Sequence, residues 1–140
     1  MTENSVLRFL RMVKTYGLTH LALGVEDPER AFRFYEQVLG VVPVYREQEF
    51  IQAQTPGSRD VIVFQKTKRR TRSSGSIAHF GFRLVDPSDI DAAVSAIERA
   101  GGTVLDHGEF CPGEPYVFFR DLDGYEVEIW HEIPTPVDPK

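Results

Sequence analysis

The chain has 140 residues, 41% hydrophobic and 26% charged, as is typical of one soluble globular domain. A formal net charge of −5 disfavours nucleic acid and anionic membranes as partners, because both favour an excess of Lys and Arg. No run approaches the roughly 18 consecutive apolar residues of a membrane span. The single cysteine, Cys111, cannot form an internal disulfide, so we expect a cytoplasmic protein whose main partner is a small molecule.

The first 16 residues mix apolar and basic side chains. Arg8, Arg11 and Lys14 interrupt the apolar positions, so the segment has no continuous apolar core of the kind found in secretory signals. The pattern predicts a short amphipathic helical extension over residues 1–16.

Two segments of the chain begin alike. Residues 19–28 read Thr-His-Leu-Ala-Leu-Gly-Val-Glu-Asp-Pro, and residues 78–87 read Ala-His-Phe-Gly-Phe-Arg-Leu-Val-Asp-Pro. The histidine, aspartate and proline recur at the same spacing, which indicates an internal repeat. We therefore expect one domain over residues 17–132, made of modules 17–66 and 77–132 and followed by a tail over 133–140.

Each opening alternates in the manner of a β-strand. In the first, Leu21, Leu23 and Val25 share one face, and His20 falls on the opposite face beside small alanine and glycine residues. His79 occupies the matching place in the second opening. Because small neighbours leave space beside each imidazole, both histidines are candidates for a pocket.

A helix is expected after each opening. Asp27 can cap a helix that starts at Pro28 and ends near Gly40, and Asp86 and Pro87 repeat this arrangement. Strand-like runs then follow at 41–46, 50–53 and 61–65 in the first module, and at 103–106, 116–120 and 126–130 in the second. The predicted fold class is α+β, with two βαβββ modules that pair into one curved-sheet cup.

The last predicted strand adds a carboxylate. Its preceding turn reads Asp-Leu-Asp-Gly at 121–124, and Glu126, Glu128 and Trp130 then share one strand face. Two histidines and one carboxylate can hold three positions around a divalent ion and leave the others for water or substrate. The sequence therefore predicts a metal site formed by His20, His79 and a carboxylate of this strand.

With these motifs the sequence resembles the vicinal oxygen chelate superfamily, which includes glyoxalase I, extradiol dioxygenases, fosfomycin resistance enzymes and bleomycin-binding proteins. The motifs that carry the resemblance are Leu-Thr-His-Leu-Ala-Leu at 18–23, Phe-Tyr-Glu-Gln-Val-Leu-Gly at 34–40, Ile-Ala-His-Phe at 77–80 and Asp-Leu-Asp-Gly-Tyr-Glu-Val-Glu at 121–128. The resemblance implies paired βαβββ modules, one divalent metal ion and a homodimer. It selects Glu128, four residues after the turn glycine, so the implied ligands are His20, His79 and Glu128.

At two positions this chain differs from the residue pattern that is typical of a particular branch of this superfamily. Glyoxalase-like members have a fourth protein ligand on the last strand of the first half, and this chain has Val63 at that position. Gln65, two residues later on the same strand face, is a reserve ligand. Extradiol dioxygenases and fosfomycin thiol transferases use three ligands but usually carry a tyrosine ten residues before the ligand glutamate, where this chain has Phe118. The ligand count therefore favours the three-ligand branches, although neither pattern is complete.

The resemblance implies a metal-dependent enzyme for a small substrate that chelates through two neighbouring oxygens. An activity like that of extradiol dioxygenases, with Fe²⁺ or Mn²⁺, is the first expectation. A glyoxalase-like lyase or isomerase, or a fosfomycin-type thiol transferase, would use Zn²⁺, Ni²⁺, Co²⁺ or Mn²⁺ as a Lewis acid. A bleomycin-resistance-like binding protein is the non-enzymatic alternative. Candidate catalytic residues are Tyr116 and His107, and Phe118 and Trp130 are candidate substrate contacts.

Overall fold

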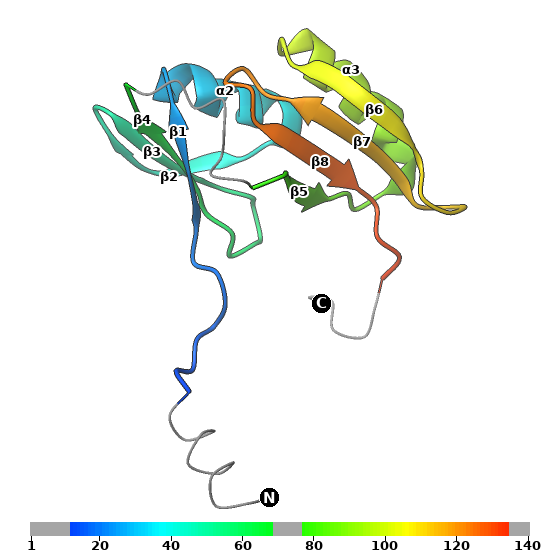
Figure 1. The fold of residues 1–140 in the computed structure, drawn as a ribbon, viewed down its shortest axis with the longest axis horizontal. Coiled ribbons are helices and arrows are strands. Elements are labelled where there is room, and N and C mark those ends of the chain that lie inside the picture. Colours follow the sequence, from blue (N-terminus) through cyan, green and yellow to red (C-terminus); the bar gives the residue numbers. More distant parts are fainter. Residues whose placement is uncertain (1–11, 69–76, 135–140) are drawn as a thin grey trace, which may run out of the picture.

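The computed structural model describes residues 12–68 and 77–134, which form two modules of one strand, one helix and three strands each (Figure 1). The first contains β1 Leu21–Val25, α2 Pro28–Leu39, β2 Val42–Glu47, β3 Phe50–Gln54 and β4 Ile62–Lys66. The second contains β5 Phe80–Arg83, the 3-10 helix η1 Pro87–Asp89, α3 Ile90–Arg99, β6 Thr103–Glu109, β7 Pro115–Arg120 and β8 Glu126–Trp130. The predicted α+β fold of two βαβββ modules is confirmed.

The predicted terminal segments lie mostly outside the described residues. This is the case for residues 1–11 of the expected N-terminal helix and for residues 135–140 of the tail, while residues 12–16 contain no helix. Within the described ranges, no helix combines the length and apolar character that crossing a membrane would require.

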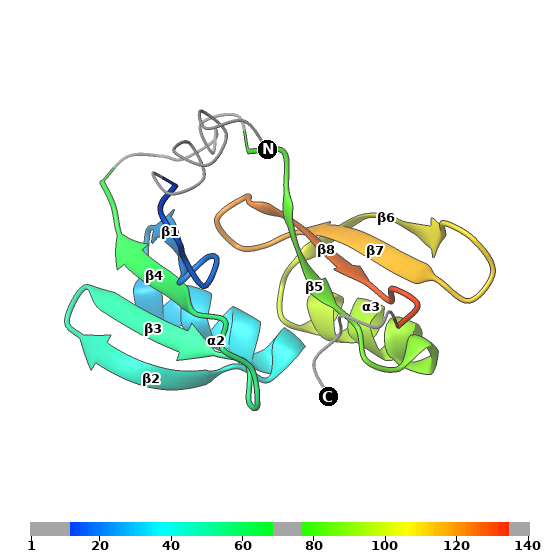
Figure 2. The ribbon, with the colours of Figure 1, turned by 90° about the horizontal axis from the view of Figure 1, so that it is seen from below.

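Each module forms its own four-stranded sheet. The strand orders are β1-β4-β3-β2 and β5-β8-β7-β6. The first strand of each module pairs in parallel with the last, β1 with β4 and β5 with β8, and the other pairs are antiparallel. The two sheets lie beside each other (Figure 2). This repeated pairing places residues 20 and 79 just before equivalent strands.

The helix ends follow local chemistry. The Asp27 side chain accepts hydrogen bonds from two backbone N–H groups of the first turn of α2, at 3.1 and 3.3 Å. Gly40 ends this helix with a φ of 69°, a left-handed conformation that suits glycine. Asp86 also caps, but its first turn is the 3-10 helix η1, and α3 starts only at Ile90. The second helix is therefore shorter than the first.

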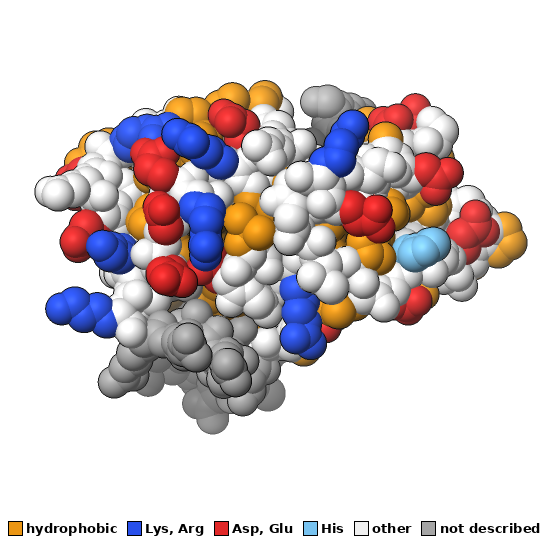
Figure 3. Space-filling view, turned by 90° about the horizontal axis from the view of Figure 1, so that it is seen from above, with side chains coloured by type: hydrophobic (Ala, Val, Ile, Leu, Met, Phe, Trp, Pro, Cys, Tyr) orange, Lys and Arg blue, Asp and Glu red, His pale blue; other side chains and the backbone are white. Residues whose placement is uncertain are grey.

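The core lies between each sheet and its helix. Helix α2 contacts β3 and β4, and α3 contacts β6 and β7. The strand side chains that face the helices are almost fully buried, among them Ile51, Phe64, Val117, Phe119 and Val127. On the outer side of the helices, charged side chains of both signs are spread over the surface (Figure 3). We call the sheet face turned away from the helices the open face.

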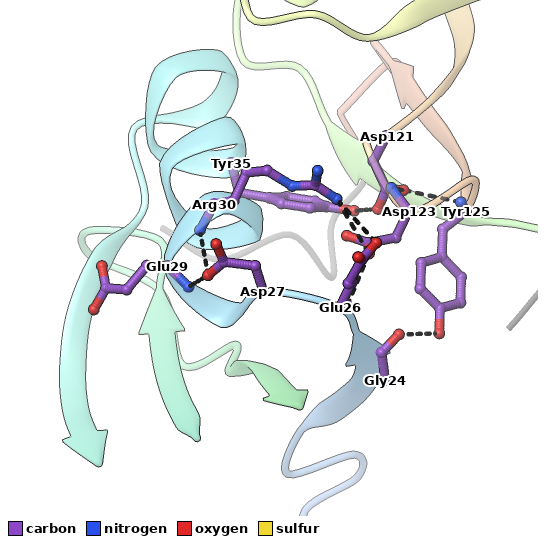
Figure 4. A network of polar contacts seen from close by, with 9 residues as sticks. All are labelled: Gly24, Glu26, Asp27, Glu29, Arg30, Tyr35, Asp121, Asp123 and Tyr125. Carbon is purple, nitrogen blue, oxygen red and sulfur yellow. Dashed lines mark hydrogen bonds and ion pairs between the residues drawn. The ribbon is translucent and has the colours of Figure 1, made fainter. Parts of the chain in front are cut away.

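A buried network of hydrogen bonds joins the two modules (Figure 4). The Tyr35 hydroxyl of α2 donates to Asp121 at 2.6 Å. The other Asp121 oxygen accepts from the backbone N–H groups of Asp123, at 3.0 Å, and Tyr125, at 2.9 Å. The Tyr125 hydroxyl in turn donates to the backbone oxygen of Gly24 at 2.8 Å. The network therefore ties β1 and α2 to the turn that precedes β8.

Aromatic packing supports the same contact between modules. Phe34 lies 6.1 Å from Phe119, and Tyr35 lies 6.3 Å from Phe82, measured between ring centroids. At Gly102 a Cβ atom would come within 2.9 Å of the Phe34 ring, so only glycine permits this approach of α2 to the start of β6. These contacts use the helix side of the second sheet, not its open face.

Replacing Tyr35 with Phe should destabilise the fold and change its response to alkali. At neutral pH we expect a loss of about 1–3 kcal/mol, because the buried Asp121 carboxylate loses its hydroxyl donor. Burial, with the charge of Asp121 beside it, raises the pKa of Tyr35 well above its ordinary value. The unfolded phenol ionises near pH 10, so the stabilisation present below that pH should fall above it by up to about 1.4 kcal/mol per pH unit.

Urea unfolding at pH 8 and at about pH 10.5 measures both effects. The Tyr35→Phe variant should lose less stability than the wild type between these two pH values, because it lacks the phenol. Tyr16→Phe is the matched control, since Tyr16 is fully exposed. An equal alkaline loss in Tyr35→Phe and in the wild type would contradict this assignment.

Candidate metal site

His79 and Glu128 come together on the open face of the second sheet. Gly81 of β5 lies opposite Glu128 of β8 in the parallel register, and His79 lies two residues before Gly81 on the same face. A Cβ atom at Gly81 would lie 3.5 Å from Glu128 Oε1, so the absent side chain leaves this space to the carboxylate. Burial raises the pKa of Glu128, and the charge of His79 opposes that shift. The two groups are therefore electrostatic neighbours.

Phe118 supports the histidine of this pair. It lies opposite Glu128 in the antiparallel register of β7 and β8. Its ring meets the His79 ring edge to face, with 5.1 Å between centroids and 89° between planes. The contact restricts the imidazole, as is useful for a metal ligand that must keep one orientation.

His20 belongs to the open face of the first sheet. It directly precedes β1, on the same side as Ala22 and Gly24, and is exposed. Its Nδ1 lies 2.6 Å from the Thr19 hydroxyl. Gln65 is opposite Gly24 on this face and is also exposed. The reserve ligand is therefore on the face of His20, on the neighbouring strand β4.

A single chain does not gather the three predicted ligands. Within residues 12–68 and 77–134, no three His, Cys, Asp or Glu side chains are placed so that they could hold one metal ion. The structure brings His79 and Glu128 together and leaves His20 on the other module. Each chain thus carries two partial ligand sets, one on each open face.

Tyr116 and Trp130 share the open face with Glu128. They lie opposite each other on β7 and β8. Tyr116 stacks on Phe110, with 4.0 Å between centroids, and Phe110 meets Trp130 at 5.8 Å. The Tyr116 hydroxyl donates to Asp106 at 3.1 Å, and this hydrogen bond is the main reason why the pKa of Tyr116 is raised.

Phe110 and Asp106 were not among the residues singled out from the sequence. A register shift between Val104 and Asp106 turns Asp106 toward the open face, opposite Phe118. Phe110 begins the turn that joins β6 and β7. The only signal in the sequence was an aromatic residue beside a Pro-Gly turn, which is weak evidence for a site.

The same register shift affects the candidate His107. This residue lies within β6 opposite Val117, whose side chain is buried on the helix side of the sheet. His107 is therefore on the sheet face away from Glu128, not in a loop over the site. Cys111 lies in the following turn, where its thiol donates to Glu114 at 2.9 Å and its pKa is raised.

Larger side chains at Gly81 should weaken metal binding in steps. Gly81→Ala adds a methyl group 3.5 Å from Glu128 Oε1 and 3.3 Å from the backbone oxygen of Glu128, which requires only a small local shift, so we expect a small loss of affinity. Gly81→Val adds two more methyl groups beside the carboxylate, and we expect at least about tenfold weaker Mn²⁺ binding, within the range found when groups that orient metal ligands are lost. Isothermal titration calorimetry measures the affinity, and circular dichroism checks the fold. Equal affinity in all three proteins would place the metal elsewhere.

Comparison with known proteins agrees with the resemblance seen in the sequence. The family model described as the glyoxalase/bleomycin resistance protein/dioxygenase superfamily matches residues 17–129. The uncharacterized protein PA2024 of Pseudomonas aeruginosa is 30% identical over 125 residues, which cover 84% of this chain and 89% of that protein.

Solved structures of low sequence identity share the fold. The fosfomycin resistance protein FosX of Mesorhizobium loti is 20% identical, with a TM-score of 0.69 over 86% of this chain and 95% of that one. A variant of FosX from Listeria monocytogenes, solved with Mn(II) and 1S,2S-dihydroxypropylphosphonic acid, is 17% identical, with a TM-score of 0.67 over 83% of this chain and 90% of that one.

Proposed function

Because the chain belongs to the glyoxalase/bleomycin resistance protein/dioxygenase superfamily, we propose that it is a divalent-metal-dependent enzyme for a small substrate with two neighbouring oxygens. His20, His79 and Glu128 hold the single ion. The observation that carries this proposal is the pairing of His79 and Glu128 on one open face, beside Gly81. Imidazole nitrogen and carboxylate oxygen are suitable donors for Fe²⁺ and Mn²⁺, and also for Zn²⁺, Ni²⁺ and Co²⁺.

The complete site forms between two copies of the chain. Each chain offers His79 with Glu128 on one module and His20 on the other, and these sets do not meet within the described part of one chain. In a twofold dimer, His20 of each copy approaches His79 and Glu128 of the other, so both sites form at once. The exposed apolar residues just before His20 support such a contact, since Leu18 is 98% exposed in one chain.

The chain supplies three ligands and leaves the other positions open for the substrate. When bound, the metal ion would act as a Lewis acid on the two substrate oxygens and lower their pKa. Glu128 contributes a negative charge that balances the cation, and Phe118 keeps His79 oriented toward it. Glu128 and Phe118 are half-buried, whereas His20 and His79 are exposed in one chain.

The proposed reaction is extradiol-type ring cleavage, in which both atoms of dioxygen enter the substrate as one carbon–carbon bond beside the diol breaks. It follows from a three-ligand set with positions for two substrate oxygens and for dioxygen. A FosX-like addition at a phosphonate-bearing substrate is the second candidate. The similarity to FosX structures, one of them with Mn(II) and a dihydroxypropylphosphonic acid, supports it.

Mixing two inactive variants tests the site between chains. His20→Ala and His79→Ala should each lose stoichiometric metal binding but stay folded. When the two proteins are mixed at equal amounts and allowed to exchange, each mixed dimer regains one complete site, so about a quarter of the total sites should bind metal. Metal analysis after desalting measures the occupancy. The control mixes His79→Ala with Glu128→Ala, which cannot complement because both lie on the same module.

Recovery in the first mixture and none in the control supports the assembly. Equal occupancy in both mixtures would contradict it, and full occupancy of any single variant would remove that residue from the ligand set.

Metal analysis and oxygen uptake distinguish the reactions. Protein purified without chelator and without oxygen should contain Fe²⁺ or Mn²⁺ and consume oxygen with a catechol, and Glu128→Ala should abolish both. Bound Zn²⁺, Ni²⁺, Co²⁺ or Mn²⁺ without oxygen uptake would favour lyase, isomerase or transferase chemistry. Ligand binding that needs no metal would instead favour a bleomycin-resistance-like binding protein.

A further inference from the structure

A groove on the helix side of the molecule lies where the two modules meet. Helix α2 forms one wall, and the end of α3 and the turn before β8 form the other. We call it the junction groove, and its main lining residues are Arg30, Arg33, Phe34, Gln37, Ala100 and Leu122. Its volume of about 510 Å³ lies within the range of small-molecule pockets. In Figure 3, which views this side, Lys and Arg side chains lie beside hydrophobic ones near the middle of the surface.

The inner part of the groove is apolar. Phe34 is only 2% exposed, and Ala100 and Leu122 are half-buried. A Cβ atom at Gly101 would come within 3.2 Å of the Leu122 side chain, so Leu122 packs closely against the end of α3. These three side chains come from both modules and together offer a surface on which the apolar part of a ligand can pack.

The carboxylates at the groove are already engaged by the chain itself. Asp27 accepts hydrogen bonds from two backbone N–H groups of α2, and Glu29 pairs with Arg46 of β2. Asp123, in the turn before β8, accepts a backbone hydrogen bond at 3.1 Å and lies 3.9 Å from the Arg30 guanidinium (Figure 4). The acidic groups here therefore have their own donors, and Arg30 has its own acids.

Two donors of α2 remain available at the groove. Within the described part of the chain, the side chains of Arg33 and Gln37 make no hydrogen bond or ion pair, and both are exposed. They are four residues apart, so they lie on the same side of the helix, one turn from each other. A guanidinium presents paired N–H groups that match the two oxygens of a carboxylate, and the amide adds a further donor.

We propose that the junction groove binds an organic anion, with its carboxylate on Arg33 and Gln37 and a short apolar chain against Phe34, Ala100 and Leu122. Arg33 is the one cation lining the described groove without an ion pair, so a singly charged carboxylate suits it better than a phosphate with nearly two charges.

This site is separate from the proposed metal centre. The junction groove is on the helix side, so it stays accessible when the open faces meet in a dimer. A ligand in it contacts α2 of the first module and the turn before β8 of the second. Because it bridges the modules only in the folded chain, the bound anion stabilises the junction between them.

Nuclear magnetic resonance titration of nitrogen-labelled protein locates and measures the binding. The probe is octanoate, with EDTA present so that no metal ion holds the carboxylate. We expect shifts of the groove amides and none at Gly81 or Glu128 of the open face. Butanoate should bind at least about tenfold more weakly, because it lacks four methylene groups that pack in the groove. The uncharged 1-octanol should bind about fivefold more weakly, the loss expected for an exposed ion pair.

Variants separate the contacts of the charged head from those of the chain. Arg33→Gln should weaken octanoate binding about fivefold and change 1-octanol binding less than about twofold. Ala100→Leu fills the inner part of the groove and should weaken both ligands by a similar factor of about five or more. Arg59→Gln is the matched control, since Arg59 is an exposed arginine in the loop between β3 and β4. We expect no change in that variant.

Thermal unfolding checks the bridging role. Octanoate should raise the unfolding midpoint of the wild type and of Arg59→Gln more than that of Arg33→Gln, because the last binds it more weakly. If Ala100→Leu fails to fold, Gln37→Ala replaces it, with a loss of octanoate affinity of about twofold or more expected for the missing donor. Equal affinity of the wild type for octanoate and 1-octanol, shifts confined to the open face, no binding of octanoate, or equal effects of Arg33→Gln and Arg59→Gln would each overturn the inference.

Discussion

The hydrogen bond between Tyr35 and Asp121 is the constraint on which the arrangement of the modules depends. Asp121 is only 8% exposed, and such a carboxylate needs donors to stay buried. It receives one from α2 of the first module and two from the backbone of its own turn. The same group therefore orders the turn before β8 and joins it to the other half of the chain.

This junction has a consequence for the site. Because the modules meet through α2 and the helix side of the second sheet, their open faces are left for other contacts. Glu128 follows the Asp121 turn along β8 and is held beside His79 by the parallel register of β5 and β8. His20 directly precedes β1 on the other module. A chain built in this way favours completion of the ligand set by a second copy, as we propose.

The two open faces also differ in chemistry, although the modules share one topology. Small and amide side chains accompany His20, with the rings of Tyr45 and Phe50 farther along the same face. Aromatic rings lie directly beside His79 and Glu128. In the proposed dimer, the substrate would lie between these two faces.

The sequence by itself determined the features that depend on neighbouring residues. The repeat predicted the two modules, Asp27, Pro28 and Gly40 predicted the ends of α2, and strand alternation predicted which side of each sheet carries His20, His79 and Glu128. These features are local, because a cap or a two-residue period acts within a few positions along the chain.

Only the tertiary structure decided which distant residues meet. The register shift in β6 put Asp106 on the open face and His107 on the other, and no composition signal marks such an irregularity. The Tyr35–Asp121 bond and the separation of His20 from His79 depend on how the modules pack, because packing joins residues far apart in the sequence. For the same reason the pairing of His79 with Glu128 could be expected from the repeat, while the place of His20 relative to them could not.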